Sequence, residues 1–517
     1  MDANQVQLLQ WGDLAALAPE LTLVIAAIVI SLIDLFLPRR VNRNVIGWLS
    51  LGSVLASLGF VLWQIVQRAK LPLEASQAVQ LLNHSYRIDD FALLIKIVLL
   101  VGTGFVLLLS LGSLRDDEEE IPHRGEYYYF LLPAAVGGMI MASSGDLITL
   151  YVGLELLSIT SYILVGMKKN DRKATEGAFK YVVLGSVASA FVLYGMSFVY
   201  GMTGTTNLGG IAAGLRDYGA SFEALVYVSF ILMFVGFGFK IAAAPFHAWA
   251  PDVYQGAATP VTAFLAVVSK AAGFAILFRI FYNLYFALGE GFIIFIDLST
   301  LILGVAAASM IIGTTMALRQ ANAKRLLALS GIANAGYLLV PIGINIIGVN
   351  TLHSSSFSEF YYYLFAYMFT NIGAFAVLMV VERSSGHDEM RGYAGLYHRS
   401  PWLAAAMTVF VLSLAGIPIT AGFFGKLFII LGAVSTHAVW IAIVIMVTSV
   451  ISFYFYFGFI RQMYMRAGTD EQVRIAVPHG IVIGVCVLAV IALGAFPNLF
   501  LTIVNTAFSI PVDLFVR

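Results

Sequence analysis

Ionisable side chains stand inside apolar segments of this chain, and the densest group lies between Gly236 and Gly273. This stretch, GFGFKIAAAPFHAWAPDVYQGAATPVTAFLAVVSKAAG, carries Lys240, His247 and Lys270 among residues apolar enough to enter a lipid bilayer. A lysine at the centre of a membrane-spanning helix costs roughly 2.5 to 3.5 kcal/mol on insertion scales. Side chains that are so costly need a function or a partner, and a buried lysine can carry a proton.

A proline indicates how the stretch is built. Pro245 follows Lys240 closely, removes one backbone N–H and clashes with the carbonyl one turn earlier, so a helix through this segment is predicted to break near Ala243. Non-helical backbone at membrane depth survives only where protein buries it or a water-filled cavity meets it. The sequence therefore predicts a broken helix that lines a hydrated path, with Lys240 and His247 on opposite sides of the break.

Composition places the chain among polytopic helical membrane proteins. Of 517 residues, 60% are hydrophobic and only 11% charged, and the mean hydropathy is +0.90, which excludes an ordinary soluble domain. The single cysteine, Cys486, excludes an internal disulfide framework and leaves too few thiols for an iron–sulfur cluster. We see no phosphate-binding loop and no cluster of metal ligands, so no redox cofactor is expected in this chain.

Apolar windows of about 20 residues predict an all-α protein with about fourteen transmembrane helices. The windows are 16–37, 45–66, 90–113, 127–143, 146–167, 177–203, 225–250, 259–283, 291–317, 325–347, 358–383, 402–432, 437–463 and 476–506. Tyrosines 127–129 and 361–363 lie near the starts of two windows, which is typical of interfacial belts.

A second broken helix is predicted in the window 402–432. There Pro418 precedes Lys426, whereas Lys240 precedes Pro245, and we interpret this mirror order as a sign of inverted repeats. The predicted organisation is an N-terminal three-helix segment over 1–126 and a first five-helix repeat over 127–283. An inverted second repeat would follow over 284–466, and a last helix and tail over 467–517.

Other ionisable residues divide into candidates for a proton path and candidates for structure. Glu155 is the one carboxylate that we place deep inside a helix, and it is the natural partner of Lys240. Lys270 and Lys426 would continue a hydrated chain, with Lys180 and His247 as auxiliary positions. His247 has an alternative role, which is to bond a carbonyl freed by Pro245. Two further residues are predicted to have structural roles only. Lys96 is expected to snorkel to the interface or to form a static ion pair, and Glu20 is expected to be solvated at the interface.

Basic residues predict the orientation. Most lysines and arginines outside the helices fall in the loops that follow odd-numbered helices, such as the segments 39–43, 168–173 and 319–325. By the positive-inside rule these loops face the cytoplasm, or the stroma of a photosynthetic membrane, and both termini face the lumenal or periplasmic side.

Four motifs, in combination, resemble one family, the antiporter-like membrane subunits of respiratory complex I and its photosynthetic relative: FKIAAAPFHAWAPDVYQGAATPVTAFLAVVSK, YVGLELLSI, LSLAGIPITAGFFGK and AKRLLALSGIANAGYLL. The phrase DVYQGAATPVTAF followed by Lys270 is similar to the N-type branch, subunit 2, and most like its cyanobacterial and plastid form. The resemblance implies that Glu155 is the modulating acid, Lys240 its partner, Lys270 the connecting lysine and Lys426 the terminal lysine of a proton channel.

The function implied by this resemblance is proton translocation within an NAD(P)H- or ferredoxin-driven (plasto)quinone oxidoreductase. Iron–sulfur clusters, quinone and the electron donor would then belong to partner subunits, among them sibling antiporter-like subunits in the same bilayer, and no nucleic acid is involved. The expected location is a cyanobacterial thylakoid membrane, with a plastid thylakoid or a bacterial plasma membrane as alternatives. Two other functions stay open: a subunit of a multisubunit sodium/proton antiporter or membrane-bound hydrogenase, and an independent secondary transporter.

Overall fold

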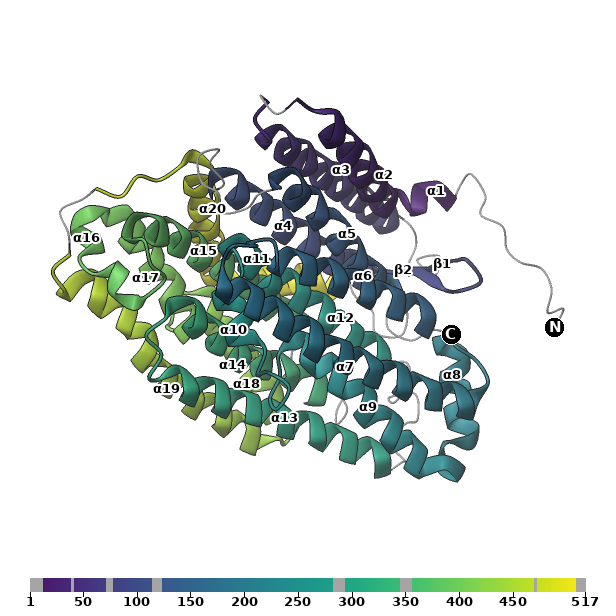
Figure 1. Ribbon diagram of the computed structural model, residues 1–517. Helices are drawn as coiled ribbons and strands as arrows, with labels where there is room; N and C mark the ends of the chain where they lie inside the picture. Colours follow the sequence, from purple (N-terminus) through teal and green to yellow (C-terminus); the bar gives the residue numbers. More distant parts are fainter. Residues whose placement is uncertain are drawn as a thin grey trace.

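Each of the predicted apolar windows corresponds to a helix, or to a helix interrupted at a defined place. The computed structural model describes residues 13–38, 41–70, 78–113, 123–281, 293–344, 356–468 and 472–507. Within these residues it is a bundle of helices with one small β-hairpin (Figure 1).

The N-terminal half begins with a short helix and three long ones. Its elements are α1 (Asp13–Ala16), α2 (Ala18–Phe36), α3 (Asn44–Ala69), β1 (Val79–Leu81), β2 (Tyr86–Ile88), α4 (Asp90–Ser113), α5 (Arg124–Ser143), α6 (Leu147–Val165), α7 (Arg172–Thr203), α8 (Leu208–Tyr218), η1 (Gly219–Phe222), α9 (Glu223–Ile241), α10 (Ala250–Gly256), α11 (Thr259–Phe264), η2 (Leu265–Ser269) and α12 (Lys270–Ile280). The strands pair antiparallel, with Gln80 opposite Arg87. This hairpin was not predicted from the sequence.

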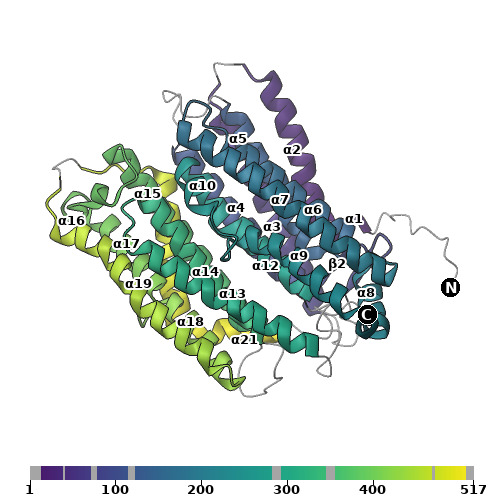
Figure 2. The same cartoon turned by 60° about the horizontal axis from the view of Figure 1, so that its bottom comes forward.

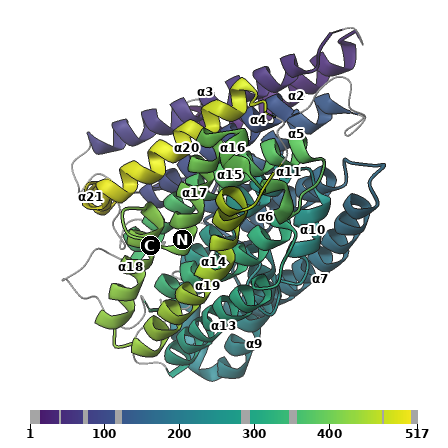
Figure 3. The same ribbon diagram turned by 90° about the vertical axis from the view of Figure 1, so that its left-hand side faces the viewer.

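The C-terminal half repeats the alternation of long helices with one interrupted helix. Its elements are α13 (Ile293–Ala317), α14 (Ala323–Ile344), α15 (Ser356–Ser385), η5 (Met390–Tyr393), α16 (Leu396–Arg399), α17 (Pro401–Ala415), α18 (Ala421–Ser435), α19 (Val439–Met465), α20 (Val477–Ala495) and α21 (Pro497–Ala507). α20 packs beside α4, so the last long helix lies against the N-terminal ones (Figure 3).

The count of membrane-spanning helices agrees with the sequence. Among the described residues, 12 helices are long and apolar enough to cross a membrane. α5, together with the interrupted pair α17 and α18, brings the number of crossings to about fourteen. The prediction of an all-α polytopic membrane protein is confirmed.

The centre of the bundle is formed by α14, by α15 and by the stretch from α11 to α12. α14 is buried along its length except at Arg325, and α15 along most of its length. α14 packs against α13 and α15 (Figure 2), and it also contacts α10 in the first half and α18 in the second. A helix with no lipid-facing side can carry polar residues without exposing them to hydrocarbon, which makes α14 and α15 suitable for a polar path.

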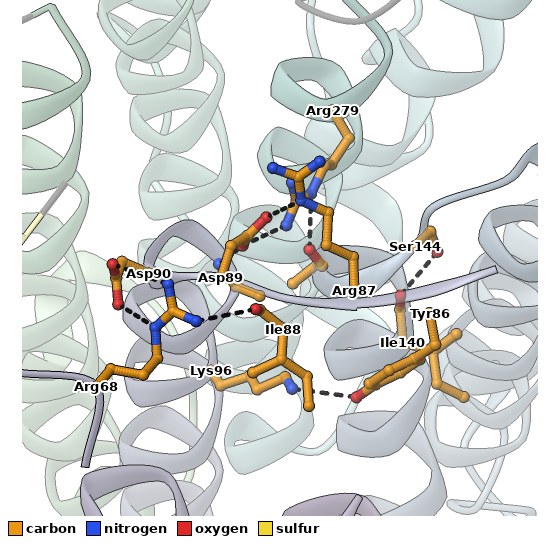
Figure 4. A network of polar contacts seen from close by, with 12 residues as sticks. Arg68, Tyr86, Arg87, Ile88, Asp89, Asp90, Lys96, Ile140, Ser144 and Arg279 are labelled. Carbon is orange, nitrogen blue, oxygen red and sulfur yellow. Dashed lines mark hydrogen bonds and ion pairs between the residues drawn. The ribbon is translucent and has the colours of Figure 1, made fainter. Parts of the chain in front are cut away.

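The hairpin is fixed to the bundle by buried charges (Figure 4). Asp89, directly after β2, accepts hydrogen bonds from Arg87 Nε at 2.8 Å and from Arg279 Nη2 of α12 at 2.6 Å. The same carboxylate accepts from the backbone N–H of Ala92 and so caps the first turn of α4. All three charged side chains are almost completely buried. One aspartate thus joins the hairpin, the start of α4 and the end of α12.

A second buried ion pair corrects one prediction and confirms another. Lys96 of α4 forms an ion pair with Glu20 of α2 at 2.8 Å, and its ammonium also donates to the hydroxyl of Tyr86. Both members of the ion pair are buried. Lys96 therefore makes the static pair that was one of its two predicted structural roles, whereas the interfacial solvation predicted for Glu20 is wrong. The carboxylate of Glu20 lies inside because α2 packs on α3 and α5, which also flank α4.

Candidate functional site

The first helix break lies where the sequence predicts it. α9 ends at Ile241, and Ala242 takes the left-handed conformation with φ 57°. The N–H groups of Ala242 and Ala243 bond the carbonyls of Phe239 and Gly238, which is a Schellman cap. The Ala244–Pro245 peptide bond beyond it is cis. The break is thus a defined, hydrogen-bonded end of a helix.

Side chains bind two backbone groups near the break. Trp249 Nε1 donates to the carbonyl of Phe239 at 3.0 Å, and Ser309 of α13 accepts from the N–H of Ala244 at 2.8 Å. Because these groups have partners inside the protein, the irregular segment can sit at membrane depth without the cost of unpaired backbone.

Lys240 lies in the last turn of α9 and faces α6. Its side chain is buried, and its Nζ donates to Ser158 Oγ at 3.1 Å. Glu155 lies one helical turn before Ser158 and interacts electrostatically with Lys240. Ser189 of α7 donates a hydrogen bond to Glu155. The structure brings the acid and the lysine that the sequence paired into electrostatic range, and Ser158 is the hydrogen-bond partner of the lysine.

Glu155 is less isolated than the sequence suggested. It is half-buried, whereas Glu20 and Glu359 are almost completely buried. Glu155 keeps its predicted place near the middle of a helix, but it is not the most buried carboxylate among the described residues. Glu20 and Glu359 both lie in the first turn of their helices, where a sequence window gives no sign of burial.

Lys270 lies directly after an irregular segment that the sequence did not reveal. The helix predicted over 259–283 contains one π-helical turn, η2, which ends at Ser269. Such insertions occur often at functional sites. Lys270 Nζ donates to the carbonyl of Gly331 at 2.6 Å and lies 3.5 Å from the hydroxyl of Tyr367. One turn later on α12, a Cβ added at Gly273 would lie 3.3 Å from Cγ of Lys240, so the stem of Lys240 packs on the helix that carries Lys270.

The second break has the same cap as the first. α17 ends at Ala415, and Gly416 has φ 82°. The N–H of Ile417 bonds the carbonyl of Leu412, five residues earlier. The bond from Ala243 to Gly238 at the first break has the same spacing. α18 begins at Ala421, so Pro418 lies within the break as predicted. Glycine takes this conformation without strain, and a Cβ at Gly416 would lie 3.0 Å from the Lys426 side chain, so the missing side chain leaves room for the lysine.

Lys426 returns to the break from α18. Its buried ammonium donates to the carbonyls of Leu414 at 2.9 Å and Ala415 at 3.2 Å, which are the last carbonyls of α17. It also lies 4.8 Å from the centre of the Tyr337 ring. The carbonyl end of a helix carries partial negative charge, so α17 itself stabilises the cation.

Two residues predicted as auxiliary positions lie apart from Lys240, Lys270 and Lys426. Lys180 is partly exposed and forms ion pairs with Glu176 at 2.7 Å and with Asp252 of α10 at 2.6 Å. His247 lies between the two helical pieces, half-buried, and contacts the Pro245 backbone, while its Nδ1 has no hydrogen-bond partner among the described residues. The contact with Pro245 fits the structural role that the sequence left open for His247.

Asp252 connects the first break to both halves of the chain. Its second carboxylate oxygen accepts from Arg325 of α14 at 2.5 Å, so α10 is fixed to α7 and α14 at once.

We expect Asp252→Asn to lower the free energy of unfolding by only about 1 kcal/mol, because the paired side chains are roughly a third exposed. The measurement is the thermal midpoint of the assembled complex, with Glu176→Gln, which leaves Asp252 in place, as the matched control. If Asp252→Asn stopped proton pumping at unchanged stability, Asp252 would belong to the proton path.

The tyrosines assigned to interfacial belts are also corrected. Tyr361, Tyr362 and Tyr363 are buried in α15, as are Tyr127 and Tyr128 in α5. The hydroxyls of Tyr361 and Tyr362 donate to the carbonyls of Leu94 and Leu493. A run of tyrosines at the start of a helix indicates a lipid interface only if that helix touches lipid. α15 is instead surrounded by protein.

A polytopic helical bundle with two capped helix breaks and a buried lysine at each defines the class of antiporter-like membrane subunits. Solved structures share the fold. A chain of respiratory complex I from Thermus thermophilus is 28% identical with a TM-score of 0.75, covering 95% of this chain and all of that one. A chain of the Mrp complex from Dietzia is 18% identical with a TM-score of 0.80, covering 96% of this chain and 97% of that one, which shows the fold alone.

The family follows from the sequence comparison. The profile described as "NADH:quinone oxidoreductase/Mrp antiporter, TM" matches residues 144–452. The NADH-quinone oxidoreductase subunit N of Paenibacillus is 52% identical over 98% of this chain and 99% of its own length. This chain therefore belongs to the NADH:quinone oxidoreductase/Mrp antiporter family of transmembrane subunits.

Proposed function

We propose that this chain is the N-type, proton-translocating membrane subunit of an NADH-quinone oxidoreductase. The observation that carries the proposal is the placement of three buried lysines, Lys240, Lys270 and Lys426, each beside a break or a π-helical turn. The similarity along nearly the whole length of a relative named as subunit N supports the same conclusion.

The residues would act by exchanging protons through changes of charge. A buried ammonium is destabilised by the loss of water and stabilised by a neighbouring carboxylate. Lys240 has Glu155 in electrostatic range and the Ser158 hydroxyl within hydrogen-bond distance, so a change in the position or charge of Glu155 shifts the protonation of Lys240. Lys270 and Lys426 would receive the proton in turn. Electron transfer and quinone reduction would take place in other subunits.

The relatives guide the choice of membrane and electron donor. The similar curated proteins are bacterial and are named for NADH and quinone, so the expectations of a thylakoid, NADPH, ferredoxin and plastoquinone have no support from them. We place the chain in a bacterial plasma membrane, which was one of the alternatives, with siblings of the same family as neighbours. This proposal also includes the cytoplasmic side of the basic loops, the periplasmic side of the termini and the division into four segments.

Sequence identity to the relatives disfavours the alternative of a sodium/proton antiporter subunit. The Mrp chain shares the fold at 18% identity, whereas the subunit N relative has 52%. Copurification with quinone reductase subunits would support the proposal, and copurification with cation antiporter subunits would overturn it. An independent transporter would instead show saturable solute uptake by the isolated chain.

The test of the proposed function is donor-driven proton uptake into inverted membrane vesicles that carry Lys240→Ala in the assembled complex. We expect a large loss of proton uptake, because positioned proton-transferring groups contribute roughly 100-fold or more to rate. Assembly is checked in parallel by the amount of this chain that copurifies with the other subunits of the complex. Undiminished proton uptake in an assembled complex would make the lysine a structural residue.

A further inference from the structure

Between Lys270 and Lys426 lies a group of buried polar side chains that no role described above includes. They come from α14, α15 and α19, and we call them the tyrosine cluster: Ser330, Asn334, Tyr337, Tyr363, Tyr367 and Tyr456. All six are nearly inaccessible to solvent. Four tyrosine hydroxyls, a serine and an amide in the middle of a membrane bundle are costly unless they bond one another or serve a path.

The cluster begins at Lys270. The ammonium lies 3.5 Å from the Tyr367 hydroxyl, and its other acceptor, the Gly331 carbonyl, follows Ser330 directly in α14. A Cβ added at Gly331 would lie 3.2 Å from the Tyr367 hydroxyl, so this hydroxyl lies beside the residue that follows Ser330. The hydroxyl of Tyr456 in turn lies 2.5 Å from Ser330 Oγ.

Asn334 holds the middle of the cluster. Its Nδ2 donates to Ser330 Oγ at 3.2 Å, and its Oδ1 accepts from the Tyr363 hydroxyl at 2.5 Å. An amide of this kind fixes the direction in which neighbouring hydroxyls point, because it is a donor at one end and an acceptor at the other. Tyr363 lies one turn before Tyr367 on α15, so both hydroxyls reach the same space.

The cluster ends at Lys426. The Tyr363 ring lies against Gly425, where an added Cβ would approach it to 2.3 Å, and its centre is 6.3 Å from that of Tyr337. The Lys426 ammonium lies over the face of Tyr337. Lysines on both sides of the cluster are thus in contact with members of it.

We propose that the tyrosine cluster is the proton path between Lys270 and Lys426. The Lys270 ammonium gives a proton to the Tyr367 hydroxyl, which releases its own proton through water to Tyr456, and Tyr456 passes one to Ser330. Each hydroxyl accepts one proton and gives up one, so no electron is transferred and no group is left changed. The last step, to the neutral amine of Lys426, runs through water beside Asn334 and Tyr363. Asn334 and Tyr363 are positioning residues in this path.

The chain supplies matched controls for a test. Tyr361 and Tyr362 stand beside Tyr363 in sequence and are equally buried, but their hydroxyls bond backbone carbonyls away from the cluster. Replacing any of these tyrosines with phenylalanine keeps the ring and removes one buried hydrogen bond. A purely structural role would therefore affect all the variants alike.

The experiment measures protons taken up per NADH oxidised in vesicles with the assembled complex, for Tyr367→Phe, Tyr456→Phe and the controls Tyr361→Phe and Tyr362→Phe. We expect the ratio to fall at least about twofold in the cluster variants and to stay unchanged in the controls. If a tyrosine variant fails to assemble, Ser330→Ala takes its place, because it removes only a small hydroxyl. We expect the same fall in the ratio of protons to NADH for this variant. Because the inference rests on the proposed function, Lys426→Ala is measured beside them.

The outcomes separate the two proposals. If Lys426→Ala loses proton uptake while the cluster variants match the controls, the path through the tyrosines is wrong and the proposed function stands. If Lys426→Ala also pumps normally, the proposed function fails and the path fails with it. An equal loss in cluster and control variants would assign the tyrosines to packing.

Discussion

Replacing Asp89 with asparagine is expected to destabilise the protein by about 3 to 5 kcal/mol, because the change removes the carboxylate from between two buried guanidinium groups. Asparagine has nearly the same shape and still caps α4, so neither packing nor the cap explains the loss. What remains is the lost negative charge beside Arg87 and Arg279, which are 2% and 0% exposed. The measurement is the thermal midpoint of the purified complex and the amount of this chain assembled in it.

Two further variants separate charge from shape. Glu389→Gln breaks an ion pair with Arg391 whose members are 43% and 71% exposed, and is expected to cost less than about 1 kcal/mol. Combining Asp89→Asn with Arg279→Met also removes one of the two cations that Asp89 binds, and should cost less than the sum of the single changes. A small effect of Asp89→Asn alone would mean that water reaches this cluster.

The pH dependence of this contribution has a definite sign. Burial acts to raise the pKa of Asp89, but Arg279 and Arg87 outweigh it and hold the pKa below the ordinary value of 3.8. A carboxylate with a lowered pKa stabilises the folded state above its unfolded pKa and loses that contribution as the pH falls through the folded value. The stability difference between the native chain and Asp89→Asn should thus be constant above about pH 5 and shrink only below about pH 4.

Both helix breaks could be predicted from the sequence and the buried ion pairs could not, for a physical reason. Proline and glycine act on the backbone locally, so Pro245 and Pro418 locate both interruptions without knowledge of the fold. Ion pairs such as Lys96 with Glu20 join helices that are far apart in sequence, and hydropathy contains no information about which helices touch. The tyrosines of α15 were misread for the same reason, since their surroundings depend on the packing of the whole bundle.

The mirror order of lysine and proline needs another explanation than inversion. Both breaks begin with the same cap in the same chain direction, from Gly238 to Ala243 and from Leu412 to Ile417. Lys240 precedes its proline because it lies on the first half of its broken helix, and Lys426 follows because it lies on the second half. An inverted repeat comes instead from an odd number of crossings per copy, which leaves chain order unchanged.

Replacing Lys426 is expected to have the largest effect on proton pumping, because it removes the proposed proton acceptor together with a cation that bonds the end of α17. The ammonium satisfies the carbonyls of Leu414 and Ala415, and leaving such groups unpaired costs about 1 to 3 kcal/mol. Lys426→Met would therefore combine a loss of stability with a loss of proton transfer. Glutamine separates the two effects, since its amide donates hydrogen bonds to the carbonyls but takes up no proton at neutral pH.

The comparison of three variants decides what Lys426 does. If it is a proton carrier, Lys426→Gln keeps assembly and thermal stability near those of the native complex but loses proton uptake as severely as Lys426→Met. Lys426→Arg keeps the positive charge but cannot release it at physiological pH, so it too should block uptake. If Lys426 only closes the end of α17, glutamine and arginine should both restore pumping, and the vesicle assay would show proton uptake rising with stability across the series.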